Sequence, residues 1–318
     1  TATPVAGGSA VTLDPAESSV FTISPATPSQ LAFKSLGSLS VTARGDFGTT
    51  PVVQILDAYG NVVKADSTTT SITISAVSSP GGTVINGSTA GNYITGNTAT
   101  ASAGEFSFPN LKVGAAAGSY VLRITSVTTS LSSQPTKSDS GSFTLTAGSV
   151  NKLAIITSAD GAAAGKPFTT QPVIEIQDAD GNKVANSTVS VTVAMTNGTL
   201  DGTDTVPAVG GVATFAGLSA SGSVSTTKVL SFSASQLTGT SQPAFTLTHG
   251  AAHHIRTTAG TGVLSILSGS TRSGINFGQQ PAVAIEDADN NRVTTGAEST
   301  QTVTVSASAS GLSGTKTV

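Results

Sequence analysis

The residues best placed to do chemistry are acids and amides that alternate along two short segments. These residues are Asp178, Asp180 and Asn182 in one segment and Asp287, Asp289 and Asn291 in the other. Oxygen ligands at alternating positions begin a calcium-binding loop. Such a loop also needs Gly at its sixth position, where this chain has Lys183 and Arg292. A β-turn opened by Asp explains the same residues. We therefore expect structural turns, with calcium as the alternative reading.

Two other groups of residues could carry chemistry. Arg44-Gly45-Asp46 spells the integrin-recognition tripeptide, a match short enough to arise by chance. The three histidines, His249, His253 and His254, cluster together, and an i, i+4 pair could ligate zinc if it were helical. The corresponding segments elsewhere, TAGSVNK and SPATPSQ, offer no such ligands. A solvated linker is therefore the expected role of the histidines.

No catalytic set can be assembled from this sequence. Cysteine is absent, histidine occurs only in that cluster, and the acids stand singly on expected turns. The sequence therefore gives no pattern that would place a nucleophile, a base and an orienting group side by side. We expect a protein that is not an enzyme, with no catalytic residue and no cofactor.

Composition narrows the class further. Of 318 residues only 10% are charged, 37% are hydrophobic, and the net charge is −3. This excludes a basic nucleic-acid footprint, and no apolar run approaches the roughly 18 residues of a membrane span. Abundant Ser, Thr and Gly without Cys favour an extracellular, cell-surface protein, with glycans conceivable at Asn86, Asn186 and Asn197. The chain starts at Thr1 without a signal-like segment, so we expect a mature or internal piece.

Internal repeats decide the architecture. Segments 48–63, 168–184 and 277–293 align, each an alternating apolar run followed by an Asp-Ala turn. A Phe-Thr-Ile/Leu phrase recurs at 21–23, 143–145 and 245–247. Its spacing of roughly 100 residues matches one seven-stranded sandwich. β-branched residues alternate throughout, and no window has helical periodicity.

The sequence therefore predicts an all-β fold of tandem Ig-like β-sandwich domains in a linear array. We expect Ig-like domains at 25–146 and 147–248 and an incomplete one at 249–318. Residues 1–24 are expected to be end strands of a preceding or neighbouring domain.

The phrase QPVIEIQDADGNKV, followed by alternating Val and Thr and by VGGVATFAGL (209–218), resembles the bacterial Ig-like repeats of surface proteins. These include the invasin/intimin type and the tandem arrays of giant adhesins. The resemblance implies a stalk, adhesin, fibre or surface layer, and that family has no catalytic residues to transfer. A structural assembly protein is the favoured reading. An adhesin that binds a host protein or glycan through its loops is the alternative.

The two ends of the sequence complement each other. Segment 302–318 aligns with 189–206, and segment 3–13 resembles 206–218, so the start supplies phrases that the third repeat lacks. Half a sandwich would expose an apolar face. We therefore expect copies of the chain to join head to tail, unless the sequence is one window of a continuous array. The expected assembly residues are Val11, Leu13, Val20, Phe21, Ile23, Val303 and Val305.

Overall fold

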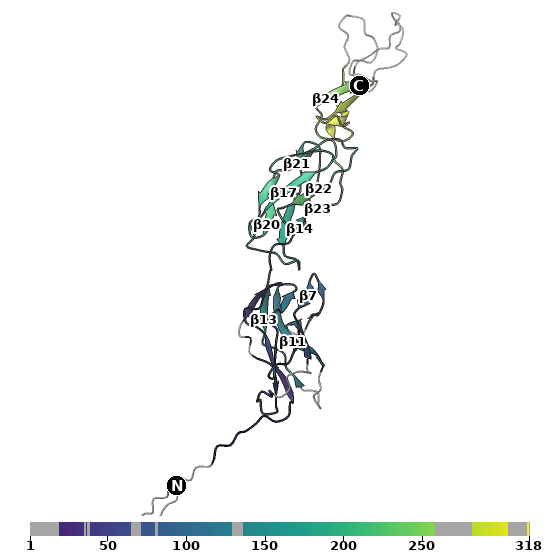
Figure 1. Ribbon diagram of the computed structural model, residues 1–318. Helices are drawn as coiled ribbons and strands as arrows, with labels where there is room; N and C mark the ends of the chain where they lie inside the picture. Colours follow the sequence, from purple (N-terminus) through teal and green to yellow (C-terminus); the bar gives the residue numbers. More distant parts are fainter. Residues whose placement is uncertain are drawn as a thin grey trace, which may run out of the picture.

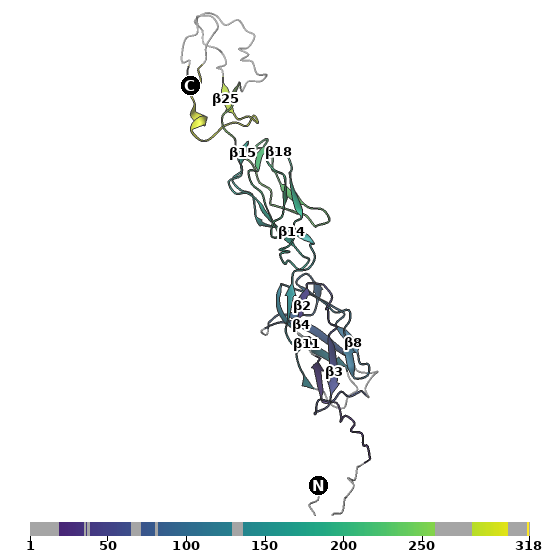
Figure 2. The ribbon, with the colours of Figure 1, turned by 90° about the vertical axis from the view of Figure 1, so that its left-hand side faces the viewer.

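The computed structural model describes residues 19–34, 36, 39–64, 71–79, 82–128, 136–257, 282–304 and 317. Over this part the chain is all-β, as the sequence predicts, and its helical content is one 3-10 turn, η1 (Ala297–Thr300). Figure 1 shows strand-rich modules that follow one another along the length of the molecule, and Figure 2 shows the same order from the side. No helix of the described residues is long and apolar enough to cross a membrane.

The first module is a β-sandwich. One sheet has the order β12-β1-β3-β9, the other has β2-β13-β11-β4-β5 with β8 also on β4, and β10-β7-β6 form a small third sheet. Its strands are β1 (Gln30–Phe33), β2 (Leu39–Thr42), β3 (Val52–Leu56), β4 (Ser71–Ser78), β5 (Val84–Ile85), β6 (Ser88–Thr89), β7 (Asn92–Thr95), β8 (Thr98–Thr100), β9 (Glu105–Ser107), β10 (Lys112–Gly114), β11 (Gly118–Thr128), β12 (Thr136–Lys137) and β13 (Phe143–Thr146). Apolar side chains between the sheets, including Phe106 and Phe143, form one continuous core.

The second module repeats this plan with fewer strands. Its sheets have the orders β14-β16-β20, β15-β21-β18 and β19-β17-β22-β23. Its strands are β14 (Lys152–Thr157), β15 (Lys166–Pro167), β16 (Val173–Gln177), β17 (Ser190–Met195), β18 (Thr199–Asp201), β19 (Thr205–Pro207), β20 (Val212–Thr214), β21 (Ser219–Ser221), β22 (Leu230–Ser233) and β23 (Thr240–Ser241). The recurring phrase at 245–247 forms no named strand here, and the segment around it makes only isolated bridges, from Phe245 to Lys228 and from Thr248 to Ala163. A separate apolar core spans this module.

The predicted alternation of inward and outward side chains is confirmed. Ile174 and Ile176 in β16 are fully buried, and so is Val191 in β17, while their neighbours are partly or fully exposed. Burial on one face follows from the two-residue period of a strand. The core therefore sits between the sheets, and in β17 the polar Ser190 and Thr192 lie on the opposite face from Val191.

The third module begins in the same way as the first two. Its described strands are β24 (His254–Thr257) and β25 (Val283–Glu286), paired antiparallel. Each module thus opens with an antiparallel strand pair in matching register. The paired residues are Leu31 and Ile55, Leu153 and Ile176, and Ile255 and Ile285. In every module the second strand of this pair leads directly into an Asp-Ala turn, so the turns occupy equivalent places.

Candidate functional site: the junctions between modules

Three turns of equivalent geometry lie where each module's first strand pair ends. We call them the junction turns: residues 57–61, 178–182 and 287–291. In each, the first Asp and the last Asn are joined by a backbone hydrogen bond, with N–O distances of 3.0, 2.9 and 2.9 Å. The fourth residue has positive φ, and Gly60, Gly181 and Asn290 tolerate this conformation. The predicted turn is therefore confirmed in all three repeats.

The first Asp of each turn is buried and fully hydrogen-bonded. Asp178 is 2% exposed and accepts four hydrogen bonds, from the Asp180 and Asn182 backbone N–H groups, the Asn182 side chain and the Gly148 N–H. Gly148 belongs to the linker that precedes the module. The carboxylate therefore ties its own turn to the incoming chain.

The same four contacts recur at the other two turns, with Ala26 and Gly250 as the linker donors. These bonds lower the pKa of Asp57 to about 2, the Asn61 side chain contributing most. Burial raises the pKa of Asp178 and of Asp287, but the hydrogen bonds outweigh it, and both pKa values lie below the ordinary value.

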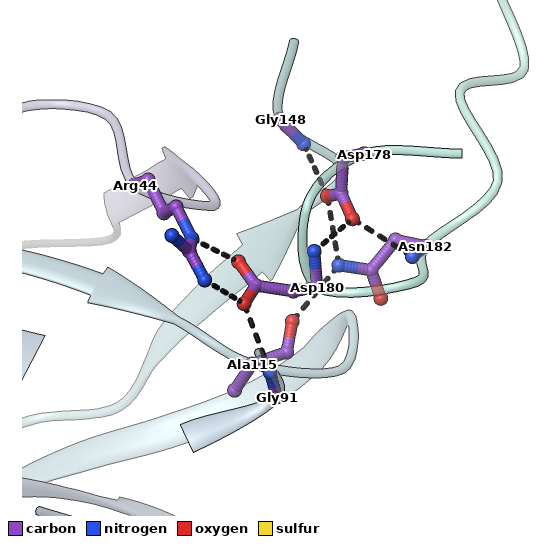
Figure 3. Close-up of polar contacts among 7 residues, drawn as sticks. All are labelled: Arg44, Gly91, Ala115, Gly148, Asp178, Asp180 and Asn182. Carbon is purple, nitrogen blue, oxygen red and sulfur yellow. Dashed lines mark hydrogen bonds and ion pairs between the residues drawn. The ribbon is translucent and has the colours of Figure 1, made fainter. Parts of the chain in front are cut away.

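The second junction turn also contacts the module before it (Figure 3). The Asn182 amide donates to the Ala115 carbonyl at 2.9 Å, and its oxygen accepts from the Ala117 N–H at 2.7 Å. Asp180 accepts from the Gly91 N–H at 2.9 Å. Asn182 thus binds the backbone of the loop between β10 and β11, which we call the receiving loop of the first module (residues 115–117), whereas the Gly91 donor lies between β6 and β7.

Arg44 adds the only side-chain ion pair described at this junction. Its guanidinium donates to both oxygens of Asp180, at 2.8 and 2.9 Å, and it lies over the Tyr93 ring, 4.1 Å from the centroid. The hydrogen bond to Asp180 raises the pKa of Arg44. The Asp180 side chain is 1% exposed and that of Arg44 is 32% exposed. The arginine of the Arg-Gly-Asp tripeptide is therefore engaged by Asp180 at the junction while its side chain stays partly exposed.

The third junction turn docks on the second module with the same pair of Asn contacts to a loop backbone. Asn291 accepts from the Val224 N–H at 2.9 Å and donates to the Gly222 carbonyl at 3.0 Å. Asp289 accepts from the Gly222 N–H at 2.9 Å. Residues 222–226, which precede β22, are thus the receiving loop of the second module. The two junctions share a turn, a linker donor and a receiving loop.

A buried lysine supports this second receiving loop. Lys228 is 0% exposed, and its ammonium donates to the Ser223 and Thr226 carbonyls and the Thr226 hydroxyl at 2.6 to 3.0 Å. Burial lowers the pKa of Lys228, and the nearby Asp289 carboxylate opposes that effect. The cation therefore holds the loop in shape and lends it positive potential, without a direct ion pair to Asp289.

The oxygens proposed as calcium ligands are used as hydrogen-bond acceptors in this geometry. The oxygens of Asp178 and Asp180 accept N–H groups from the turn, the linker, Gly91 and Arg44. Those of Asp287, Asp289 and Asn291 do the same at the other junction. Within the described residues no three His, Asp or Glu side chains gather as a metal site requires. The geometry gives these acids a structural use.

The histidines lie at the second junction, as their clustering suggested. His249 accepts from the Thr295 N–H at 3.2 Å, and His254 lies 3.3 Å from the Glu286 carboxylate. His253 makes a backbone bond to Glu286 and faces His254. His249 and His253 are linker residues that contact the third module, as expected, whereas His254 is the first residue of β24 and so belongs to that module.

A pocket beside the first junction has an uncharged lining: Thr42, Ala147, Gly148, Ser149, Val150, Val184, Asn186, Ser187, Thr188 and Val189. A Ser or Thr hydroxyl is activated as a nucleophile by an adjacent general base, and these lining residues include no carboxylate, imidazole or amine side chain.

The expected assembly residues are only partly within the described chain. Val20, Phe21 and Ile23 are described and strongly exposed, and Val303 is half-buried. Val11, Leu13 and Val305 lie outside the described residues.

Comparisons with known proteins leave the family open. No protein-family model matches the chain, and no curated protein does. The D0-D1 domain of intimin is 14% identical over 70% of this chain and 98% of its own, with a TM-score of 0.24. Fibronectin(III)-like modules of Clostridium thermocellum CbhA are 13% identical over 71% and 99%, with a TM-score of 0.21. A β-glycosidase from Bacteroides vulgatus is 10% identical over 69% of this chain and 25% of its own, with a TM-score of 0.29. Similarity at this level concerns the β-sandwich fold alone.

Proposed function

We propose that this chain is a non-catalytic structural repeat protein of the cell exterior, a fibre, stalk or layer component whose modules join head to tail. The observation that carries the proposal is the junction itself, built twice from the same parts. At each, a buried Asp holds the linker, and an Asn donates and accepts one backbone hydrogen bond on the module before.

The contacts suit a rod that resists bending. The linker is short, because β13 ends at Thr146 just before the anchored Gly148, and Thr248, which bridges Ala163, stands just before the anchored Gly250. Each glycine approaches the preceding module closely, since an added Cβ would meet the Ala43 or the Ala164 carbonyl. Backbone contacts on both sides of the linker restrict hinge motion, which otherwise is the default between domains.

The surface composition fits an exterior location. With 10% charged residues and no Cys, the solubility of the rod rests on Ser and Thr hydroxyls, whose hydrogen bonding depends little on salt. Immunogold electron microscopy of the producing cells tests this part. We expect label on extracellular filaments, stalks or a lattice. Label confined to the cell interior would overturn the proposal.

Rigidity can be tested at one junction with a single small change. Gly114 lies against Asp180, and a Cβ there would overlap that carboxylate and the Arg44 side chain. We expect Gly114→Val to push the second junction turn off its receiving loop. Spin labels at Thr144→Cys and Ser241→Cys, in a chain that has no cysteine of its own, report the distance between modules.

The labelled chain is expected to give one narrow distance distribution, and Gly114→Val a broad one. Gly118→Ala is the matched control, because the added Cβ would meet only ordinary contacts, at 3.8 Å or more. A broad distribution in the chain without Gly114→Val would show that the modules hinge freely and that the rod is not built as proposed.

A further inference from the structure

The first and second modules differ in how their closing segment is held. In the first module β13 runs parallel to β2 over four consecutive pairs, from Phe143 with Leu39 to Thr146 with Thr42. The Ala43 N–H extends this pairing with a hydrogen bond of 2.8 Å to the Thr146 carbonyl. We call β2 with β13 the closing ladder of the first module. It joins the second strand of the module to the last one.

The corresponding pairing in the second module is reduced to one bridge, between Thr248 and Ala163. The Ala164 N–H donates to the Thr248 carbonyl at 2.9 Å, and the Thr248 N–H donates to the Ala162 carbonyl at 3.0 Å. All residues of this module lie in the described part of the chain, and none of them lengthens the bridge into a strand. The closing segment is therefore held to this neighbour over one residue pair instead of four.

The difference follows from the residues opposite the closing segment. In the first module these are Leu39-Ser40-Val41-Thr42, which include β-branched side chains and place apolar residues at alternate positions. The equivalent hydrogen bonds of Ala43 and Ala164 align them with Asp160-Gly161-Ala162-Ala163 of the second module. Gly161 has a φ of 70°, which takes the backbone out of the extended conformation that a ladder requires. The ladder of the second module therefore stops at its single bridge.

Side-chain packing adds to this difference. In the closing ladder Val41 is 2% exposed, and Leu39 packs against the core from a half-buried position. The matching residues of the second module are Ala162, which packs against its core with a smaller side chain, and the exposed Asp160. Removal of β2 from the first module exposes more apolar surface to water than removal of the equivalent segment from the second.

Tension along the chain loads these segments in shear. The modules follow one another along the length of the molecule (Figure 1), so each is pulled through the segments by which the chain enters and leaves it. Because β2 and β13 are parallel, a pull on the start of one and on the end of the other slides the two strands along each other. The hydrogen bonds of a parallel ladder are evenly spaced along its strands, so sliding strains all of them together. A single bridge gives way alone.

We propose that, of the first two modules, the second yields first under tension, and that the closing ladder keeps the first module folded at that force. This rests on the proposed function, which makes the chain part of a fibre, stalk or layer, and it adds a mechanical order to the modules. Forced unfolding is governed by the unfolding rate rather than by equilibrium stability. The rod therefore lengthens by one module before the first module fails.

A single-molecule force experiment on the full chain, held by its two ends, tests this order. The first module (25–146) has about 20 residues more than the second (147–248), so its unfolding releases about 7 nm more at about 3.5 Å per residue. We expect the shorter of these two steps to precede the longer one as the force rises. The longer step first, or both steps at the same force, would overturn the proposal.

Engineered disulfides assign each step to its module, in a chain that has no cysteine of its own. Ala163→Cys with Thr248→Cys joins the bridged residues of the second module, and Thr42→Cys with Thr146→Cys joins a pair of the closing ladder. Under oxidising conditions each pair should abolish one step, because the residues between the two cysteines can no longer extend. A reductant should restore that step.

Ser40→Gly tests the closing ladder as the cause of the order. Ser40 is exposed and stands where the second module has Gly161, so the change weakens the ladder and leaves the core intact. We expect the unfolding force of the first module to shift toward that of the second. Ser107→Gly is the matched control, because Ser107 is an exposed serine in β9, an edge strand outside the closing ladder.

The two glycine variants should lower the urea midpoint of the first module by similar amounts, whereas only Ser40→Gly should lower its unfolding force. Equal changes of force in both variants would overturn the role of the closing ladder. None of these measurements depends on the location of the protein or on whether its junctions bend. Failure here is therefore distinguishable from failure of the proposed function, which immunogold labelling and spin-label distances test.

Discussion

The two internal junctions share their backbone contacts and differ in their cations. At the first, Arg44 makes a bidentate pair with Asp180 across the interface. At the second, Lys228 donates its hydrogen bonds within its own module, and its interaction with Asp289 is Coulombic, without a direct hydrogen bond. The buried Asp, the linker N–H and the Asn contacts are present at both. The comparison suggests that backbone hydrogen bonds build a junction and that the cation adjusts its strength.

Removing an anchor carboxylate is therefore expected to have the largest effect. Asp178→Ala leaves four N–H donors without their acceptor, and each buried unsatisfied donor costs about 1–3 kcal/mol. We expect the second module to lose at least about 3 kcal/mol of unfolding free energy, measured by urea denaturation. Asp178→Asn keeps one acceptor oxygen and should lose less. Equal losses for the two variants would contradict the acceptor role.

Acid should weaken every junction at once. The side chain of an unperturbed Asp has a pKa of about 3.9. In the folded protein the pKa values of Asp57, Asp178 and Asp287 are all lower, and that of Asp57 is about 2. Their contribution is complete above the unfolded pKa and is lost as the pH falls through the folded value. We expect thermal stability to be flat from about pH 7 to 5 and to fall from about pH 4 toward 2.

The acid effect should depend on the anchors. With Asp57, Asp178 and Asp287 all changed to Asn, the stability between about pH 4 and 2 should fall much less steeply. A slope that is unchanged in this triple variant would assign the acid sensitivity to other carboxylates.

The cations should have smaller and unequal effects. Arg44 is partly exposed, so its pair with Asp180 is discounted for solvent to about 1 kcal/mol. In a double-mutant cycle of Arg44→Ala and Asp180→Asn, hydrogen exchange at the Ala117 amide should report that coupling. The parallel cycle of Lys228→Met and Asp289→Asn, read at the Val224 amide, should give less than half of it. Arg44→Lys keeps the charge but loses the bidentate geometry, and should recover only part. Equal coupling energies in the two cycles would show that the direct ion pair between Arg44 and Asp180 adds no stability to the first junction.

Much of the fold could be predicted from the sequence because its signals are local. Alternation of apolar residues places Ile174, Ile176 and Val191 inside, and an Asp followed by Gly or Asn specifies a turn. Repetition of the phrase that ends in Asp178 also located all three turns. These features depend on residues a few positions apart, so one sequence suffices to read them.

The use made of the turns could not be predicted in this way. Arg44 and Asp180 are 136 residues apart in sequence, and nothing near either one indicates the other. In the sequence Arg44 stands out only as part of a tripeptide, and no motif marks Lys228. The sequence does carry one signal of this use. The third position of the turn is Asp in the second and third repeats (Asp180 and Asp289) but Tyr59 in the first, which indicates that the first turn has different neighbours.

Removal of divalent cations should have the smallest effect of all on stability. An unchanged melting temperature in EDTA would favour hydrogen-bonded turns over calcium-binding turns. If N–H groups satisfy the anchors, EDTA should shift the melting temperature by no more than about 2 °C, and added calcium should do no more. If calcium occupied Asp178, Asp180 and Asn182, the N–H bonds from Gly148 and the ion pair with Arg44 would have to give way. Stability would then rise with the logarithm of the calcium concentration. Asp180→Asn distinguishes the cases, because it should abolish any calcium response while leaving most backbone contacts in place. A large loss of stability in EDTA that Asp180→Asn removes would replace the hydrogen-bonded junction with a metal-bound one.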